Sequence, residues 1–143
     1  MKATVLYYSH TGKTAAYAKA IAMYLWSKGL NVSLSSISDF DKSKLDSTDI
    51  LFNGCWTCGW FVVGQHPHKK WRKFSKGISG ILPETSIMFF TTYKFCAGSM
   101  LYFMKSAMGI SGYSNSKILK SKNVFLSDTD KTLIDEFIKN NAK

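Results

Sequence analysis

Short apolar runs alternate along the chain with longer segments in which apolar residues recur every three or four positions. The short runs are bounded by polar or turn-forming residues, which is typical of buried strands. The longer segments are typical of amphipathic helices. This pattern predicts strands over residues 3–9, 30–37, 49–54, 86–93 and 116–121.

The clearest predicted helix follows the first strand. Residues 14–28 contain neither Gly nor Pro, and Gly29 stands where a helix commonly ends. The buried face of this helix is predicted to consist of Ala18, Ile21, Ala22 and Leu25. Further helices are predicted to begin at Pro67, after Gly98 and at Ser127 or Asp128, with a short one within residues 38–48. The apolar stripes of the Pro67 helix and of the last helix are Trp71, Phe74 and Ile78, and Leu133, Ile134, Phe137 and Ile138.

Strands that alternate with helices favour a parallel sheet with right-handed crossovers and helices on both faces. No repeat, low-complexity tract or linker-like segment divides the sequence, so residues 1–143 are predicted to form a single α/β domain of three layers around a five-stranded sheet. In such sheets, ligands bind beyond the carboxyl ends of the strands. The loops after the first, third and fourth strands are therefore the candidate ligand site.

Composition narrows the class of protein. Hydrophobic residues make up 45% of the 143 residues and charged residues 20%, which is typical of a folded, soluble protein. No apolar run approaches the ~18 residues of a membrane span, and the apolar start is too short for a secretory signal. A cytoplasmic location without membrane contact is therefore expected.

The first loop, SHTGKT, joins the first strand to the first helix and has the composition of a phosphate site. The hydroxyls of Ser9, Thr11 and Thr14 surround Gly12 at a helix N-terminus. Free N–H groups, the positive end of the helix dipole and short hydroxyl donors all favour a phosphate dianion, and glycine lets the backbone approach it closely. The alternative is an ordinary helix start, capped by threonine, with nothing bound.

Two other phosphate motifs are excluded by spacing. The residues GKT at 12–14 match the end of a Walker A motif, but the glycine that opens this motif would stand at Tyr7. A dinucleotide fingerprint needs three spaced glycines, and this loop has one.

Residues 5–21, VLYYSHTGKTAAYAKAI, resemble the N-terminal signature of the flavodoxin family. The resemblance rests on the aliphatic strand and on Tyr7, Ser9, Gly12, Thr14, Ala18 and Ile21, and it extends more loosely over the whole chain. It implies a doubly wound, five-stranded parallel sheet with FMN at the strand ends. The residues that would hold the FMN phosphate are Ser9, Thr11, Gly12 and Thr14, with the backbone amides of His10 and Lys13.

The loop after the third strand, NGCWTCGWFVVGQHPH, matches part of the flavin-contacting pattern of that family by keeping Gly54, Thr57 and Gly59. Trp56 replaces the usual proline, and Cys58 replaces the usual aromatic residue. Trp60, slightly favoured, or Trp56 would then stack on the isoalloxazine, because an indole offers a broad π face. Thr57 and Gly59 would offer backbone groups to the polar edge of the flavin. The alternative is that both indoles pack in the core.

Cys55 and Cys58 form the pair CWTC. A thioredoxin-like pair opens a helix whose N-terminus lowers the pKa of the first thiol, but glycines flank this pair and no helix is predicted behind it. A zinc site of Cys55, Cys58 and Cys96 with His66 or His68 is a lesser alternative. The favoured interpretation has no metal: two small side chains line the flavin pocket, with redox activity of the thiols left open.

The fourth strand ends in TTYKFCAGSM, where the resemblance implies a second flavin-contacting segment. Thr92 and Tyr93 are predicted to contact the ring. The alternative for Tyr93 is packing against the following helix. The acidic residue that the family often carries in this loop is absent.

The chain is basic, with 19 Lys and Arg against 9 Asp and Glu and a net charge of +10, and Glu84 is the one acid between Ile50 and Ser127. Such a surface would steer an acidic partner, and salt would weaken the steering. Two charges ~10 Å apart interact by ~0.4–1.7 kcal/mol at an effective dielectric of about 20 to 80. The flavin is therefore predicted to be easier to reduce fully than in acidic relatives.

Three functions are compatible with these observations. An FMN-binding electron carrier, serving an acidic redox protein or a small acceptor, is favoured because no general acid–base constellation is present. An FMN-dependent reductase that passes electrons from NAD(P)H to quinones is the alternative, so whether the protein is an enzyme is open. A flavin-free module that binds nucleic acid or a membrane surface is disfavoured, because the positive charges are spread along the whole chain.

Overall fold

The computed structural model describes residues 1–60, 63–94, 97–111 and 117–142. Within these residues the main sheet has five parallel strands in the order β2-β1-β3-β6-β7. Its strands are β1 (Lys2–Tyr8), β2 (Asn31–Ser36), β3 (Ile50–Trp56), β6 (Ile87–Thr92) and β7 (Ile118–Ser121). The architecture confirms the predicted α/β class and the five-stranded parallel sheet.

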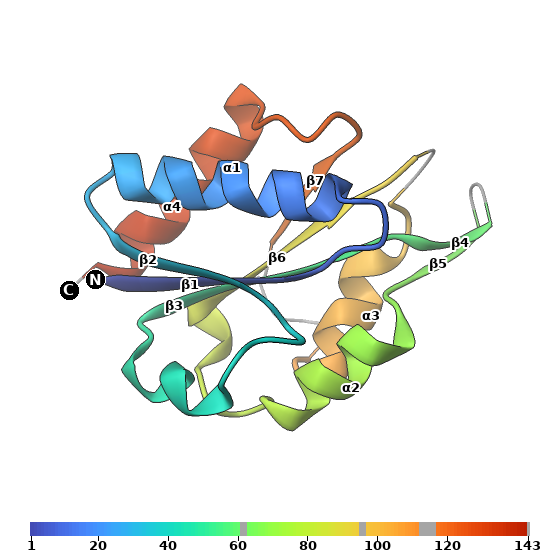
Figure 1. Cartoon of the computed structure of the whole chain (residues 1–143), viewed down its shortest axis with the longest axis horizontal. Helices are drawn as coiled ribbons and strands as arrows, with labels where there is room; N and C mark the ends of the chain where they lie inside the picture. The colour runs from blue at the N-terminus through green and yellow to red at the C-terminus, as the bar shows by residue number, and fades with distance from the viewer. Residues whose placement is uncertain (61–62, 95–96, 112–116, 143) are drawn as a thin grey trace.

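Helices cover both faces of this sheet (Figure 1). They are α1 (Lys13–Ser27), α2 (Lys69–Gly77), α3 (Met100–Ala107) and α4 (Asp128–Asn141), with short 3₁₀ helices at Lys42–Ser47 and Glu84–Ser86. Helices α1 and α4 lie on one face, and α2 and α3 lie on the other. The described chain therefore has three layers, and none of its helices is long and apolar enough to cross a membrane.

Each face of the sheet carries its own hydrophobic cluster, and β1 contributes to both. Ala3 and Val5 pack in the cluster that contains buried residues of α1 and α4. Leu6 packs in the opposite cluster, with Trp71 of α2 and Met104 of α3. Successive side chains of a strand point to opposite faces, so a strand that is covered on both sides needs apolar residues at nearly every position. This requirement explains the continuous apolar runs of the sequence.

The order of the strands reverses between β1 and β3. After β1 the chain passes outward to β2, returns across β1 to β3, and then continues outward to β6 and β7. Tyr8 and Cys55 are paired at the carboxyl ends of the two central strands. Parallel sheets of this kind bind ligands at such a switch point. The loops after β1, β3 and β6 meet there.

Two features differ from the prediction. A two-stranded antiparallel hairpin of β4 (Cys58–Trp60) and β5 (Val63–His66) stands where the sequence predicted a loop. The helix predicted from Pro67 begins at Lys69, because the His68 side chain accepts a hydrogen bond from the Lys70 N–H at 3.1 Å and acts as N-cap. Trp71 and Ile78 are buried as predicted, whereas Phe74 is half-buried.

The last helix begins as predicted. Ser127 is its N-cap, and Asp130 completes a capping box with it. The buried Asp130 carboxylate also accepts a hydrogen bond of 2.8 Å from the Tyr17 hydroxyl of α1. This bond ties the first helix to the last one on the same face of the sheet.

Candidate functional site

Three segments lie together at the carboxyl edge of the sheet. They are the loop between β1 and α1, the end of β3 with the hairpin that follows it, and the end of β6 (Figure 1). The sequence placed every candidate site residue in one of these segments. The structure brings the segments into direct contact through hydroxyl and ring contacts.

The first loop presents polar groups to solvent at the start of α1. His10, Thr11, Gly12 and Lys13 are exposed, and Ser9 is half-buried. Gly12 is the N-cap with a left-handed backbone (φ 89°), and it provides no side-chain cap for the first turn of the helix. Its N–H donates to the Ser9 Oγ at 3.1 Å. An uncapped helix N-terminus with exposed donors is an anion site in the geometric sense.

Thr14 differs from its loop neighbours because it is buried. Its hydroxyl lies 2.7 Å from the hydroxyl of Thr92 at the end of β6. Both residues are at most 5% exposed. The pair therefore joins the first turn of α1 to the third segment of the site, and Thr14 faces the end of β6 rather than solvent.

Thr57 is held against the end of β6 by two contacts. Its N–H donates to the Thr92 carbonyl at 2.9 Å, and its hydroxyl lies 2.8 Å from that of Thr91. Thr91 in turn donates to the Cys55 carbonyl at 2.7 Å. These bonds fix the backbone that leads from β3 into the hairpin. The position of Trp56 between Cys55 and Thr57 is therefore well defined.

Trp56 is the last residue of β3, and its indole lies between two histidines. The ring centroids are 5.2 Å from His10 of the first loop and 5.8 Å from His68 at the start of α2. Among the described residues, its buried Nε1–H has no acceptor. A buried donor without a partner is costly and uncommon. A ligand acceptor at this place would satisfy it.

The cysteine pair is not activated. Cys55 is fully buried, and burial raises the pKa of its thiol to about 12. Burial likewise raises the pKa of the Cys58 thiol to about 11, against the smaller opposing effect of the Arg72 guanidinium. Cys55 is the second-last residue of β3 and Cys58 is the first residue of β4, so neither stands at a helix N-terminus. Both thiols are protonated at neutral pH, unlike those of a thioredoxin-type pair.

The predicted lesser alternative, a zinc site, depended on Cys96, which lies outside the described residues. In the described ranges no group of three His, Cys, Asp or Glu side chains is placed to hold a metal ion. The two histidines of that proposal have other contacts. His68 caps α2, and the His66 Nδ1 lies 3.0 Å from the Pro67 carbonyl.

Of the residues predicted to contact the ring, the structure describes the side chain of Tyr93 but not that of Trp60. Tyr93 is half-buried, its N–H donates to the Ser121 carbonyl at 3.1 Å, and the Lys122 Nζ lies 5.6 Å from its ring centroid. Trp60 and Gly59 belong to β4, but the position of the Trp60 indole lies outside the described part of the structure. The stacking role of Trp60 or Tyr93 stays a prediction.

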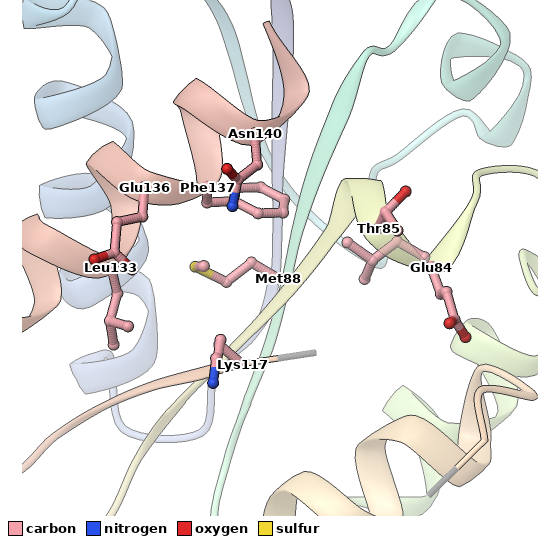
Figure 2. Close-up of a pocket in the computed structure, with 9 residues that line it drawn as sticks. Glu84, Thr85, Met88, Lys117, Leu133, Glu136, Phe137 and Asn140 are labelled. Carbon is pink, nitrogen blue, oxygen red and sulfur yellow. The ribbon is translucent and has the colours of Figure 1, made fainter. Parts of the chain in front are cut away.

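A separate cavity of about 310 Å³ lies at the opposite edge of the sheet (Figure 2). Met88 near the start of β6 and Leu133 and Phe137 of α4 form its apolar wall, and Glu84, Glu136 and Lys117 bring charge to it. The amino ends of β6 and β7 border it. It is therefore distinct from the site at the carboxyl edge, and sequence reasoning gave no sign of it.

Comparison with known proteins identifies a matching family model and solved structures of similar fold. The family model described as Flavodoxin matches residues 5–99, while no curated protein matches. Solved structures of similar fold include a flavodoxin from the domain Archaea, with 20% identity, 99% and 96% of the two chains covered and a TM-score of 0.66. Two-electron reduced Megasphaera elsdenii flavodoxin has 17% identity, coverage of 96% and 98% and a TM-score of 0.70. Oxidised Flavodoxin 2 from Bacillus cereus has 16% identity, coverage of 98% and 99% and a TM-score of 0.68.

Proposed function

The chain belongs to the flavodoxin family and is an FMN-binding electron-transfer protein, and from this premise we propose how its own residues hold the flavin. The observation that carries the proposal is the exposed, uncapped start of α1 at the switch point between β1 and β3. It offers backbone donors and hydroxyls where the family resemblance requires a phosphate. FMN supplies the electron chemistry, because it accepts and releases one or two electrons.

The FMN phosphate is assigned to the first loop. Its ligands are the hydroxyls of Ser9, Thr11 and Thr14 and the backbone N–H groups of His10 and Lys13. Gly12 suits this cradle, because the loop turns into the helix through a left-handed backbone that other residues rarely adopt. Lys13 adds a positive charge beside the phosphate.

The isoalloxazine is assigned to the segments after β3 and β6. The unpaired Nε1–H of Trp56 fits a flavin oxygen or nitrogen, and this fit favours Trp56 as a polar contact of the ring. The residues that line the ring are Cys55, Trp56, Thr57, Cys58, Gly59, Trp60, Thr92 and Tyr93. The two protonated thiols serve as small, neutral neighbours of the flavin, and no disulfide step is assigned to them.

The protein passes its electrons to a redox partner. An acidic partner protein suits the net charge of +10, and a small-molecule acceptor is the simpler possibility for the same flavin. We place this activity in the cytoplasm and in a single domain of residues 1–143. The chain acts as a carrier rather than as a stand-alone reductase, since the described residues of the site offer no acid–base constellation.

The decisive experiment is a titration of the purified apoprotein with FMN, followed by absorbance and by quenching of tryptophan fluorescence. One equivalent of FMN is expected to bind and to shift the flavin bands. An unchanged flavin spectrum at excess FMN would refute the proposal. Oxidation of NAD(P)H by the FMN-loaded protein with a quinone, without a partner reductase, would instead identify a stand-alone enzyme.

A further inference from the structure

An open groove of about 740 Å³ lies between α2 and α3, outside the flavin site. One wall carries positive charge from α2. The other is contributed by α3 and the turn after it, including Phe103, which is 37% exposed. The cations of the first wall are Lys69, Arg72, Lys73 and Lys76.

The charge of this groove follows from the helix periodicity of α2. Trp71 and Ser75 are buried against the sheet, so the intervening basic residues point away from it. Among the residues that the structure describes, no acidic side chain lines the groove, and none of its four cations forms an ion pair. Although the positive charges are spread along the sequence, α2 brings four of them together on one face of the structure.

The groove begins beside the flavin site. Lys69 follows His68, whose ring lies 5.0 Å from that of Tyr8 and 5.8 Å from that of Trp56. The other wall is anchored at the same end, since the Ser99 hydroxyl before α3 donates to the Gln65 carbonyl of β5 at 2.7 Å. A protein docked in the groove therefore lies against the edge of the flavin site.

We propose that this α2–α3 groove is the docking site for an acidic redox protein that exchanges electrons with the flavin, an inference that rests on the proposed function. Unpaired cations supply charge complementarity for carboxylates. Phe103 lines the groove, and the exposed Tyr102 lies against it with the ring centroids 5.2 Å apart. These rings supply the aromatic surface that protein interfaces favour. Continuity with the flavin site favours a redox protein over a nucleic acid.

The test uses reduced plant-type ferredoxin, an acidic iron–sulfur protein, as electron donor to the oxidised, FMN-loaded protein. One electron leaves the reduced cluster and enters the flavin, and the rate is followed by stopped-flow absorbance. The groove variant is Lys73→Glu with Lys76→Glu. The matched control is Lys19→Glu with Lys139→Glu, which makes the same change of net charge at exposed positions of α1 and α4.

The groove variant is expected to lose about tenfold or more in bimolecular rate at low salt. The control pair is expected to lose less than about threefold in the same rate. High salt should make the rates of the wild type and the two variants nearly equal. Equal losses in the two variants, or rates that are insensitive to salt, would overturn the proposal.

Two further measurements distinguish a failure of the docking proposal from a failure of the proposed function. FMN binding and photoreduction of each variant test the flavin site alone. Calorimetric binding of ferredoxin to the apoprotein tests docking alone, and it should weaken in the groove variant. A single-stranded oligonucleotide that binds more tightly than ferredoxin at physiological salt, and is lost in the groove variant, would reassign the groove to nucleic acid.

Discussion

The buried hydroxyls of Thr14 and Thr92 lie 2.7 Å apart. This contact joins the first turn of α1 to the end of β6, through two residues that are 78 positions apart. It holds the loop that we assign to the phosphate in a fixed relation to the segments that we assign to the flavin ring. A single buried hydroxyl pair therefore connects the two halves of the cofactor site.

Replacing Thr92 by Val removes this hydroxyl while keeping the shape of the side chain. We expect the FMN dissociation constant to rise about fivefold, since one hydrogen bond contributes ~1 kcal/mol. Thr4→Val is the matched control, because Thr4 forms a similar buried pair with Thr48 at 2.8 Å near the other end of β1. It should lower stability by a similar amount without changing FMN affinity, and a loss of affinity in both variants would contradict the assignment.

The glycine of the first loop provides a test based on the backbone. Gly12 has φ 89° and Gly29 has φ 88°, and an added Cβ would meet no atom within 4 Å at either position. Gly12→Ala and Gly29→Ala should each cost ~1–2 kcal/mol of unfolding free energy through strain, measured by urea denaturation of the apoproteins. Only the Gly12 variant should also bind FMN more weakly, and equal FMN affinities would contradict a phosphate cradle at residues 9–14.

Trp56 and Trp71 predict opposite outcomes for the same substitution. Trp56→Phe removes a buried N–H that has no acceptor among the described residues. We expect weaker FMN binding by about fivefold, with no hydrogen-bond penalty in the apoprotein.

Trp71→Phe is the matched control. It removes the donor to the buried Asn53 Oδ1 at 2.9 Å, so it should destabilise the apoprotein by ~1–3 kcal/mol and leave FMN affinity unchanged. Isothermal titration and urea denaturation measure the two quantities, and the reverse pattern would exclude Trp56 from the site.

His68 predicts a pH dependence of stability. Burial, and then the neighbouring Lys70 and Lys69, hold the pKa of this histidine below its usual value. The unfolded chain therefore binds the proton more readily, so stability is fully present above about pH 6.5 and falls as the pH drops through the lowered value. Protonation of Nδ1 would also remove the acceptor that caps α2.

His68→Asn keeps a capping side chain that does not titrate. Its unfolding free energy should therefore depend less on pH between 7.5 and 5.5 than that of the wild type. Urea denaturation at three pH values within this range measures both profiles, and parallel profiles would contradict the role of His68.

The basic surface predicts that nearby cations make full reduction of the flavin easier. Lys122 lies beside Tyr93, with its Nζ 5.6 Å from the ring centroid. A unit charge ~10 Å from the flavin changes a one-electron couple by about 20–70 mV. Lys122→Gln should therefore make full reduction of the flavin harder by that amount, because it removes a cation that favours the anionic reduced form.

A dye-coupled redox titration measures this shift. Lys139→Gln is the control, since Lys139 lies in the last turn of α4, near Asn141, which contacts Thr85 and Ser86 before β6. Lys139→Gln should leave the potential of the flavin couple nearly unchanged. A wild-type couple as low as that of acidic flavodoxins would refute the predicted ease of reduction.

Local patterns were sufficient for most of the fold. The strands of the main sheet and the helices α1, α3 and α4 lie within a few residues of the predicted ranges, because a doubly covered sheet and amphipathic helices impose periodicity directly on the sequence. The hairpin of β4 and β5 was missed for the converse reason. Strands of three and four residues gain their hydrogen bonds from each other, and residues 57–66 show no extended alternation that would reveal them.

The sequence by itself was enough to predict the phosphate loop, because a glycine and hydroxyls at a helix start are a local requirement of anion binding. The tertiary structure decided that Thr14 faces Thr92, that the Trp56 donor is buried without a partner, and that the cations of α2 line a groove with α3. Thr14 and Thr92 are 78 positions apart, the groove joins two separate helices, and the burial of the Trp56 donor depends on what surrounds its side chain. Only the packing of the sheet and helices brings such groups together.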